Sequence, residues 1–209
     1  MTAATVALRQ SRMVDRLADE GITDARVLAA MAAVPRERFV SSELADAAYD
    51  DTPLPIGGGQ TISAPFVVAR MVAALELVGG ERVLEIGTGH GYAAAVLAAC
   101  GAEVVSVEYD GELAVTARRC LAAAGVTGVE VRHGDGALGA PDRAPFEAVS
   151  MTATGPQFPP AVLDQVRPDG VLVGPLGEDR DGVLVRRQRG REVALGPVRF
   201  VPLRGAVPS

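Results

Sequence analysis

A glycine-rich turn between an apolar run and an alanine-rich run is the part of the chain best suited to chemistry. The apolar run ends at Ile86, and Gly87, Gly89 and Gly91 follow before the alanines begin at Ala93. This spacing predicts a strand, a tight turn and a helix start, as in the first half of a nucleotide-binding βαβ unit. Glycine lets the backbone adopt positive φ and lets a ligand come close. The helix start offers unpaired N–H groups to an anion.

Three neighbouring residues indicate which nucleotide this turn would bind. Tyr92 stands where a dinucleotide fingerprint has a small residue for close helix–strand packing. Glu85, just before the turn, would repel a pyrophosphate but suits a cationic group. Glu108 ends the next expected strand, where an acid accepts hydrogen bonds from ribose hydroxyls. Together they favour S-adenosylmethionine, which has an ammonium and a sulfonium and no phosphate. An α/β domain whose first turn merely needs glycine is the structural alternative.

Composition limits the kind of protein this can be. At 209 residues, 48% of them hydrophobic, the chain is one domain or one domain with appendages, and it can bury a single core. Its net charge of −6 and pI of about 5.0 argue against nucleic acid as the main partner. The N-terminus lacks an apolar signal core, and no uncharged apolar run reaches about eighteen residues, so we expect no membrane span.

Side chains that bind metals or form disulfides are few. The two cysteines are Cys100 and Cys120, without a CxxC pair, and the histidines are His90 and His133. We therefore expect no metal site and no disulfide scaffold. A reducing cytoplasm is the default compartment for such a chain, and we expect a monomer there.

The N-terminal third is expected to be mostly helical. Residues 12–32 predict a helix that breaks at Gly21, with Thr23 or Asp24 capping the second piece. A further helix over residues 66–77 would feed the first strand.

Residues 49–65, rich in Gly, Pro, Asp and Thr, lie between these helices. Leu54, Ile56 and Ile62 within this segment would need burial, which favours a structured loop over a linker. Loops of this length inside a compact domain are usually functional.

After the glycine turn, strand and helix patterns alternate. The expected strands are 83–86, 104–108, 129–133, 148–151, 171–175, 183–189 and 198–202, with helices over 92–99, 112–124 and 160–166. The crossover rule makes the first five strands a mostly parallel sheet, and the last two, with no helix between them, should be antiparallel. We expect an α/β, doubly wound Rossmann-like core over residues 79–209. Residues 1–78 would add the N-terminal helical appendage and the loop, within one compact domain.

Several segments also resemble those of one family. They include PLPIGGGQTISAP, VLEIGTGHGY, HGDGALG and VRFVPLRG, and the first of these is absent from other methyltransferases. On these segments the chain resembles the protein-L-isoaspartate O-methyltransferase family over nearly its whole length. The resemblance implies a class I S-adenosyl-L-methionine-dependent methyltransferase fold, with S-adenosyl-L-homocysteine as product. It also implies methylation of the α-carboxylate of L-isoaspartyl residues in damaged proteins or peptides. The ester would cyclise to a succinimide that hydrolyses partly to L-aspartate.

The resemblance also implies roles for individual residues, and none of them is a metal ligand. Ser63 matches the position treated as catalytic. The donor-binding positions are Gln60, Thr61, Ile62, Ser63, Glu85, Gly87, Thr88, Gly89, Gly91, Glu108, Tyr109, Gly134, Asp135 and Gly136. The substrate-binding positions are Pro55, Ile56, Gly57, Ile62, Ser63 and Thr152.

Carboxylate chemistry agrees with these roles. A carboxylate has a reference pKa near 4, so it is an anion at neutral pH and needs no general base to attack a methyl sulfonium. Catalysis is then mostly alignment of the reacting atoms. A serine hydroxyl in a rigid loop could hold the nucleophile, and the chain shows no Ser/His/Asp or Cys/His set. Taken alone, Ser63 could be an ordinary loop or N-cap serine, because it precedes Ala64, Pro65 and a helix.

Departures from the family pattern leave alternatives open. His90 stands where the family usually has a small polar residue, and we expect it to point to solvent rather than clasp the donor carboxylate. Consecutive glycines over 57–59 loosen the substrate loop, and Arg204 replaces a hydroxyl residue of some relatives. One alternative is a dedicated O-methyltransferase that esterifies an aspartate of a ribosomally made modified peptide to form an aspartimide. Others are a non-catalytic donor-binding protein and a small-molecule methyltransferase.

Overall fold

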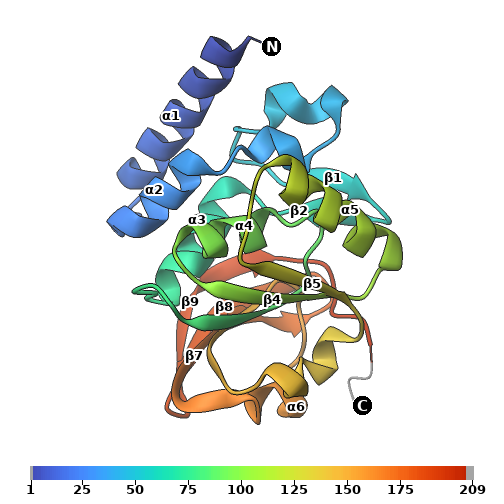
Figure 1. Cartoon of the computed structure of the whole chain (residues 1–209). Helices are drawn as coiled ribbons and strands as arrows, with labels where there is room; N and C mark the ends of the chain where they lie inside the picture. Colours follow the sequence, from blue (N-terminus) through green and yellow to red (C-terminus); the bar gives the residue numbers. More distant parts are fainter. Residues whose placement is uncertain (1, 206–209) are drawn as a thin grey trace.

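One seven-stranded sheet organises the computed structural model, which describes residues 2–205. The strand order is β5-β4-β3-β6-β7-β8-β9 (Figure 1). The strands are β3 (Arg82–Ile86), β4 (Glu103–Glu108), β5 (Val129–His133), β6 (Phe146–Met151), β7 (Val166–Glu178), β8 (Asp181–Gln188) and β9 (Arg191–Arg199). The first five are parallel and the last two antiparallel, as expected. The order reverses between β3 and β6, and open α/β sheets bind ligands at such a point.

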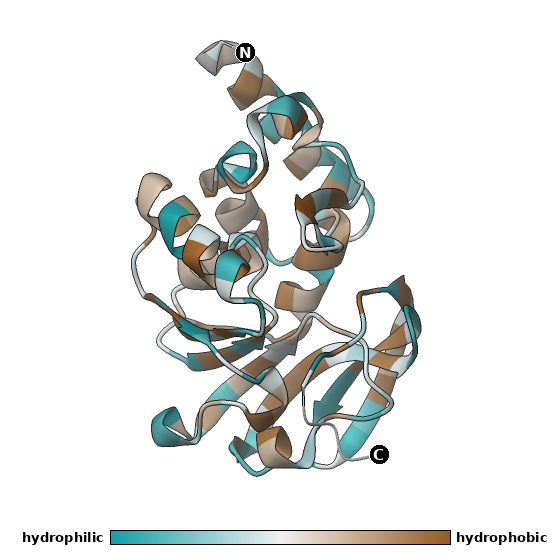
Figure 2. Ribbon diagram, turned by 90° about the vertical axis from the view of Figure 1, so that its right-hand side faces the viewer, coloured by the Kyte–Doolittle hydropathy of each residue, from teal (hydrophilic) through white to brown (hydrophobic). Residues whose placement is uncertain are grey.

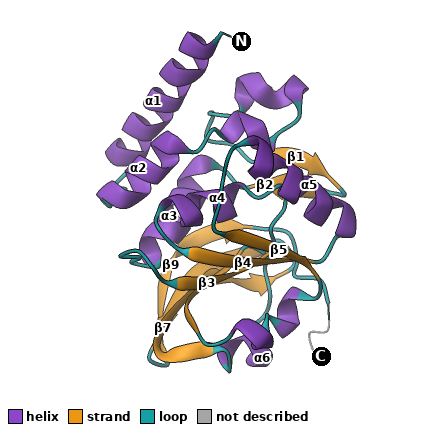
Figure 3. Ribbon diagram, viewed as in Figure 1, coloured by secondary structure: helices purple, strands orange, loops and turns teal. Residues whose placement is uncertain are grey.

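Helices cover the two faces of this sheet unequally. One face packs on α3 (Pro65–Ala74), α4 (Tyr92–Ala99) and α5 (Gly111–Ala123), whose apolar side chains join those of the strands in the main core. The other face holds a smaller core with the one-turn helix α6 (Pro160–Leu163). Figure 3 shows these layers, and in Figure 2 the central strands carry much of the hydrophobic sequence. The expected Rossmann-like class is confirmed, with a thin second layer.

The N-terminal helices form an upper layer beyond α3 and α4 (Figure 1). Helix α1 (Ala3–Asp19) and helix α2 (Ala25–Ala33) are separated at Gly21, as predicted. Asp24 caps α2, because its Oδ1 accepts from the backbone N–H groups of the second and third helical residues at 2.9 and 3.3 Å. Helix α1 starts nine residues earlier than predicted, with Thr2 as its cap. No helix within residues 2–205 combines the length and apolar character needed to cross a membrane.

The last strand lies earlier in the sequence than expected. Strand β9 covers Arg191–Arg199, and the prediction of 198–202 was wrong. Arg189 and Gly190 both adopt positive φ, so they turn the chain in two residues and pairing begins at once. Charged residues at the start of β9 hid its strand pattern.

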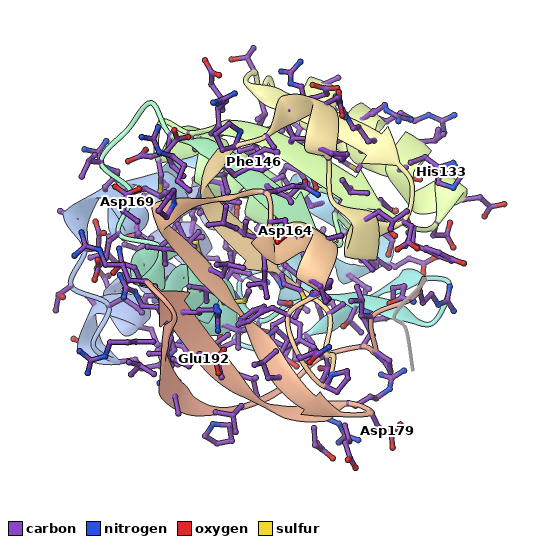
Figure 4. The ribbon with its side chains drawn as sticks, turned by 90° about the horizontal axis from the view of Figure 1, so that it is seen from below. His133, Phe146, Asp164, Asp169, Asp179 and Glu192 are labelled. Atoms are coloured by element: carbon purple, nitrogen blue, oxygen red, sulfur yellow. The ribbon has the colours of Figure 1, made fainter. Side chains whose placement is uncertain are left out.

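Helix α6 is shorter and β7 longer than predicted. Helix α6 stops at Leu163 and β7 begins at Val166, inside the helix expected over 160–166. The Gln165 side-chain amide donates to two carbonyls at 2.8 Å each, one within α6 and one in the turn after β5. This buried amide holds the junction between helix and strand. Figure 4 shows the far end of β7, where Asp179 lies at the tip of the β7–β8 hairpin.

Candidate functional site

A cavity of about 300 Å³ opens where the strand order reverses, at the carboxyl ends of β3 and β6. Its walls come from the glycine turn after β3, the end of β4, the residues after β6, helix α3 and the segment that follows β9. A two-stranded hairpin of β1 (Leu54–Gly57) and β2 (Gln60–Ile62) closes another side. Residues from six parts of the chain therefore meet around one space.

The glycine turn is fixed from beneath by Thr152. The Thr152 hydroxyl lies 2.9 Å from the Ile86 carbonyl and 2.7 Å from the Gly87 carbonyl, and it donates to them. Gly87 has φ +89, and a Cβ there would lie 2.4 Å from the Thr152 oxygen. Only glycine therefore fits this position. Thr152 lines the cavity, but its hydroxyl proton is committed to the turn.

Glu108 presents a carboxylate to the cavity from the end of β4. Its Oε2 accepts from the Gly89 backbone N–H at 2.8 Å, and its Oε1 accepts from the Asp110 N–H at 2.9 Å. The side chain lines the cavity and is 7% exposed. Each oxygen keeps a further lone pair for another donor. A fixed carboxylate of this kind is suited to accept hydrogen bonds from a pair of hydroxyl groups.

Glu85 lies beneath the turn and does not line the cavity. The carboxyl is fully buried; its Oε2 lies 2.5 Å from Ser106 Oγ, and its Oε1 has no hydrogen-bond partner within residues 2–205. Burial raises the pKa of Glu85 to about 8; the Ser106 hydrogen bond opposes this and nearby Glu108 adds to it. The sequence suggested an anion beside a cationic ligand group, and this buried placement differs from that expectation.

Within the segment 49–65, which was expected to be a structured loop, residues 54–62 form the β1–β2 hairpin. Leu54, Ile56 and Ile62 are buried, as expected, at 6%, 8% and 7% exposure. Ile56 lies over the glycine turn, since a Cβ at Gly89 would approach its side chain to 3.0 Å. The hairpin is therefore a structured wall that faces the turn across the cavity.

Ser63 follows the hairpin and lines the cavity, half-buried. Helix α3 does not use it as a cap, because its N-cap residue is Ala64 and Asp51 accepts from the Phe66 backbone N–H at 2.8 Å. The Ser63 hydroxyl has no hydrogen-bond partner within residues 2–205. The hydroxyl is therefore available to a molecule in the cavity.

His90 is held by the N-terminal layer, and the prediction that it points to solvent was wrong. Its Nδ1 lies 3.0 Å from the carbonyl oxygen of Phe39, at the end of a 3-10 helix over Arg36–Phe39. A carbonyl can only accept, so Nδ1 carries the proton. The neighbouring Tyr92 is buried in the same layer, with the Arg36 guanidinium 4.8 Å from its ring centroid. The large residue after the turn therefore anchors the N-terminal layer.

Most of the residues expected at the site meet in the cavity. Those lining it are Ile56, Gln60, Thr61, Ile62, Ser63, Gly87, Thr88, Gly89, Glu108, Tyr109, Gly136 and Thr152. Those outside its wall are Pro55, Gly57, Glu85, Gly91, Gly134 and Asp135. Gly91 instead gives α4 its left-handed N-cap, close to Leu121 of α5. Asp135 caps a short 3-10 helix by accepting from the Ala137 N–H at 2.9 Å.

Two parts of the wall escaped the sequence analysis. Helix α3 contributes Val67, Val68, Met71 and Val72, and the segment after β9 contributes residues 200–204. This segment is held by Thr154, whose backbone N–H donates to Val201 and whose carbonyl accepts from Leu203, both at 2.8 Å. In the sequence, only the resemblance of VRFVPLRG to the family indicated that this segment matters. Across residues 2–205, no three His, Cys, Asp or Glu side chains are grouped to hold a metal ion.

Comparisons with known proteins agree on one family. The family model described as Protein-L-isoaspartate(D-aspartate) O-methyltransferase matches residues 8–207. Protein-L-isoaspartate O-methyltransferase 1 of Rhodopseudomonas palustris (strain HaA2) is 49% identical over 97% of this chain and 86% of its own. Protein-L-isoaspartate O-methyltransferase of Anaeromyxobacter dehalogenans (strain 2CP-1) is 52% identical over 90% of this chain and 94% of its own.

Solved structures show the same fold. A protein-L-isoaspartate O-methyltransferase superposes with a TM-score of 0.84 at 27% identity, over 94% of this chain and 66% of that one. A Plasmodium falciparum protein described as a putative protein-L-isoaspartate O-methyltransferase, in complex with S-adenosyl-L-homocysteine, gives 0.81 at 23% identity, over 94% and 98%. With the matched sequence family, these similarities show that the chain belongs to the protein-L-isoaspartate(D-aspartate) O-methyltransferase family.

Proposed function

We propose that this protein methylates the α-carboxylate of L-isoaspartyl residues in damaged proteins or peptides, with S-adenosyl-L-methionine as the methyl donor. One observation carries the proposal. The fixed carboxylate of Glu108 and the hydroxyl of Ser63, which has no hydrogen-bond partner within residues 2–205, line the same cavity beside the glycine turn. The bound donor supplies an electrophilic methyl group on a sulfonium. The resulting ester can cyclise to a succinimide, which opens partly to L-aspartate.

The donor half of the cavity fits this assignment. Glu108 would accept from the ribose hydroxyls with its remaining lone pairs. Gly87, Thr88 and Gly89 would hold the amino-acid end, where the absence of a Cβ at Gly87 lets the backbone approach closely. The adenine side would lie toward Tyr109 and Gly136, with Gly91, Gly134 and Asp135 shaping the turns behind the wall. Gln60, Thr61 and Ile62 would cover the donor from the hairpin.

Ser63 is the group that we assign to the substrate carboxylate. A carboxylate only accepts hydrogen bonds, so the protein must supply a donor, and the Ser63 hydroxyl has one to give. The Thr152 hydroxyl already donates to backbone carbonyls, so Thr152 would contact the substrate without donating a hydrogen bond to it. Pro55, Ile56, Gly57 and Ile62 would shape the hairpin side of the substrate path.

No side-chain base is needed for this reaction. The carboxylate oxygen forms a bond to the methyl carbon as the sulfur–methyl bond breaks, and the electron pair of that bond stays on sulfur. Anion and cation become a neutral ester and a neutral thioether, so no proton moves. The work of the protein is alignment and exclusion of water.

The test offers an isoaspartyl peptide and its aspartyl twin with the methyl donor and measures methanol released from the ester by base. We expect methylation of the isoaspartyl peptide only. Ser63→Ala should lower the rate about ten- to a hundredfold, the value of one hydrogen bond to a charged group. Ser63→Thr, which keeps the hydroxyl, is the matched control and should retain more activity. A wild-type rate in Ser63→Ala would overturn the role of Ser63.

The dedicated peptide-modifying alternative is not favoured, since the relatives above carry isoaspartate methyltransferase names. Methylation of the aspartyl peptide but not of the isoaspartyl peptide would favour this alternative.

We also propose a cytoplasmic monomer whose partner is the damaged protein or peptide, rather than nucleic acid or a membrane. The net charge of −6 and the unpaired Cys100 and Cys120 support this setting. In our proposal, residues 1–78 cover the site and residues 79–209 form the core of one domain. Residues 1 and 206–209 of that division lie outside the described residues. Size-exclusion chromatography with light scattering tests the monomer.

A further inference from the structure

A polar row crosses the sheet beneath the cavity. Ser106 on β4, Glu85 on β3 and Ser150 on β6 are partners in the parallel register, so their side chains share one face. All three are buried, with at most 2% exposure. Their counterparts two residues earlier, such as Val83, belong to the main apolar core. A carboxyl group therefore lies inside an apolar layer with hydroxyl groups as its cross-strand neighbours.

The hydrogen bonds of Glu85 form a chain that ends at the cavity wall. Glu85 Oε2 lies 2.5 Å from Ser106 Oγ, and Ser106 Oγ lies 2.5 Å from Thr88 Oγ1. Thr88 lines the cavity in the glycine turn. Each hydroxyl has one proton, so if Ser106 donates to Glu85 then Thr88 must donate to Ser106, whereas a proton on Oε2 of Glu85 leaves the Ser106 proton for Thr88. A proton on Oε2 of Glu85 therefore allows both bonds to run from Glu85 toward Thr88, and an ionised Glu85 does not.

The two directions leave different groups without a partner. If Glu85 were ionised, Ser106 would donate to it and Thr88 would donate to Ser106. The anionic Oε1 would then be buried with no hydrogen bond, which is costly. If Oε2 carries a proton, Glu85 donates to Ser106 and Ser106 donates to Thr88. The unpartnered atom is then a neutral carbonyl oxygen, and the Thr88 proton is free to point into the cavity.

We propose that Glu85 is a neutral carboxylic acid that acts as a positioning residue, setting the chain so that Thr88 offers a hydrogen-bond donor to the cavity. Such a donor suits an anionic group, and the α-carboxylate of the methyl donor is the anion that this end of the cavity would receive. The ligand part of this inference rests on the proposed function. The protonation state of Glu85 does not.

Few charged groups face Glu85. Glu108 lies on the neighbouring strand β4, and its negative charge favours the neutral acid. Strand β6 presents Ser150, which does not titrate. Of the helices on this face, α3 carries Arg70, which lies against Gly196 of β9, and α4 carries Tyr92, which holds Arg36. Helix α5 carries Arg118, which donates to the Val131 carbonyl of β5, and Arg119, which is exposed. No cation is therefore placed to keep Glu85 ionised among the described residues.

The first experiment measures protonation without any ligand. Infrared difference spectra between wild type and Glu85→Gln at pH 7 should show the carbonyl stretch of a protonated carboxyl in the wild type only. This band should disappear as the pH rises past 8, because Glu85 then ionises. Glu103→Gln, at the exposed start of β4, is the matched control and should leave the band unchanged. A wild type with no such band at pH 7 would overturn the proposal.

The second experiment measures binding of S-adenosyl-L-homocysteine by calorimetry from pH 6.5 to 9. Glu85→Gln keeps a donor toward Ser106 at every pH, so wild type should lose about tenfold in affinity relative to this variant between pH 7 and 9. The ratio removes the titration of the ligand's own amino group. Thr88→Val should bind about tenfold or more weakly and Thr88→Ser within about threefold of wild type. A ratio that stays constant with pH, or a folded Glu85→Gln that binds tenfold more weakly at pH 7, would contradict the role of the neutral acid.

These outcomes separate the two proposals. If isoaspartyl methylation failed while the infrared band and the binding ratio behaved as expected, the substrate assignment alone would be wrong. If the infrared band were present but the Thr88 variants bound S-adenosyl-L-homocysteine as the wild type does, Glu85 would be a neutral acid without the proposed role in donor binding.

Discussion

Replacement of Glu85 by Gln should change how the stability of this protein depends on pH. The pKa of Glu85 is raised from 4.5 to about 8 in the folded protein by burial. Between these values the folded state holds a proton at Glu85 that the unfolded state has lost. Stability rises with pH only where the unfolded state binds more protons, so here the Glu85 contribution falls as pH rises. It is fully present below pH 4.5 and is lost by about pH 8.

The size of the effect follows from the width of that window. Between pH 4.5 and 8, each rise of one pH unit shifts the unfolding equilibrium of the wild type tenfold toward the unfolded state. From pH 5 to 8 this amounts to about 4 kcal/mol, because Glu85 is fully buried and no screening by solvent reduces it. Glu85→Gln, which cannot ionise, should lack this loss. The variant should therefore gain stability relative to the wild type as pH rises, and the gain should level off above pH 8.

Urea unfolding at pH 5.5, 6.5, 7.5 and 8.5 measures this difference directly, since the shared effects of other titrating groups cancel between the two proteins. Glu103→Gln, exposed on the same strand as Ser106, should follow the wild type at every pH. A stability difference between wild type and Glu85→Gln that does not change with pH would show that the pKa of Glu85 is not raised. Glu85 would then be ionised at neutral pH, contrary to the proposal.

Three further predictions concern the cavity. Glu108→Ala should weaken S-adenosyl-L-homocysteine binding about ten- to a hundredfold in calorimetry, and unchanged affinity in a folded variant would remove Glu108 from the donor site. Gly87→Ala should lower Tm and donor affinity more than Gly80→Ala, because both positions have positive φ but only Gly87 would place a Cβ against Thr152; equal effects would refute the collision. The single-turnover methylation rate should be level from about pH 6 to 8 and keep that shape in His90→Ala, whereas a tenfold rise per unit that His90→Ala abolishes would indicate a histidine base.

Local patterns predicted the centre of the fold well. The helix over Tyr92–Ala99 and the strand over Val129–His133 begin and end where the sequence places them. Both depend on short-range causes, a glycine turn before the helix and β-branched residues in the strand. The same holds for the break at Gly21 and the cap at Asp24.

Features set by long-range pairing could not be predicted in this way. The segment after β9 reaches the cavity only because Thr154 pairs with it, across about fifty residues of sequence. The partner of Glu85 is Ser106, and only the sheet register brings the two together. A lone sequence shows that Glu85 is acidic, but its charge state depends on what surrounds it.

Glu85 and His90 have one feature in common that the sequence does not show. Each was expected to act by its own chemistry on a ligand or on solvent, and each instead bonds within the protein. His90 ties the glycine turn to Phe39, and Tyr92 beside it packs on Arg36 and donates to the Met31 sulfur at 3.6 Å. The turn is thus held from above by the N-terminal layer and from below by Thr152. A reaction that needs alignment rather than proton transfer depends on such support. Glu85 and His90 therefore serve as fixed structural partners of this turn, while the hydroxyls of Ser63 and Thr88 and the carboxylate of Glu108 line the cavity.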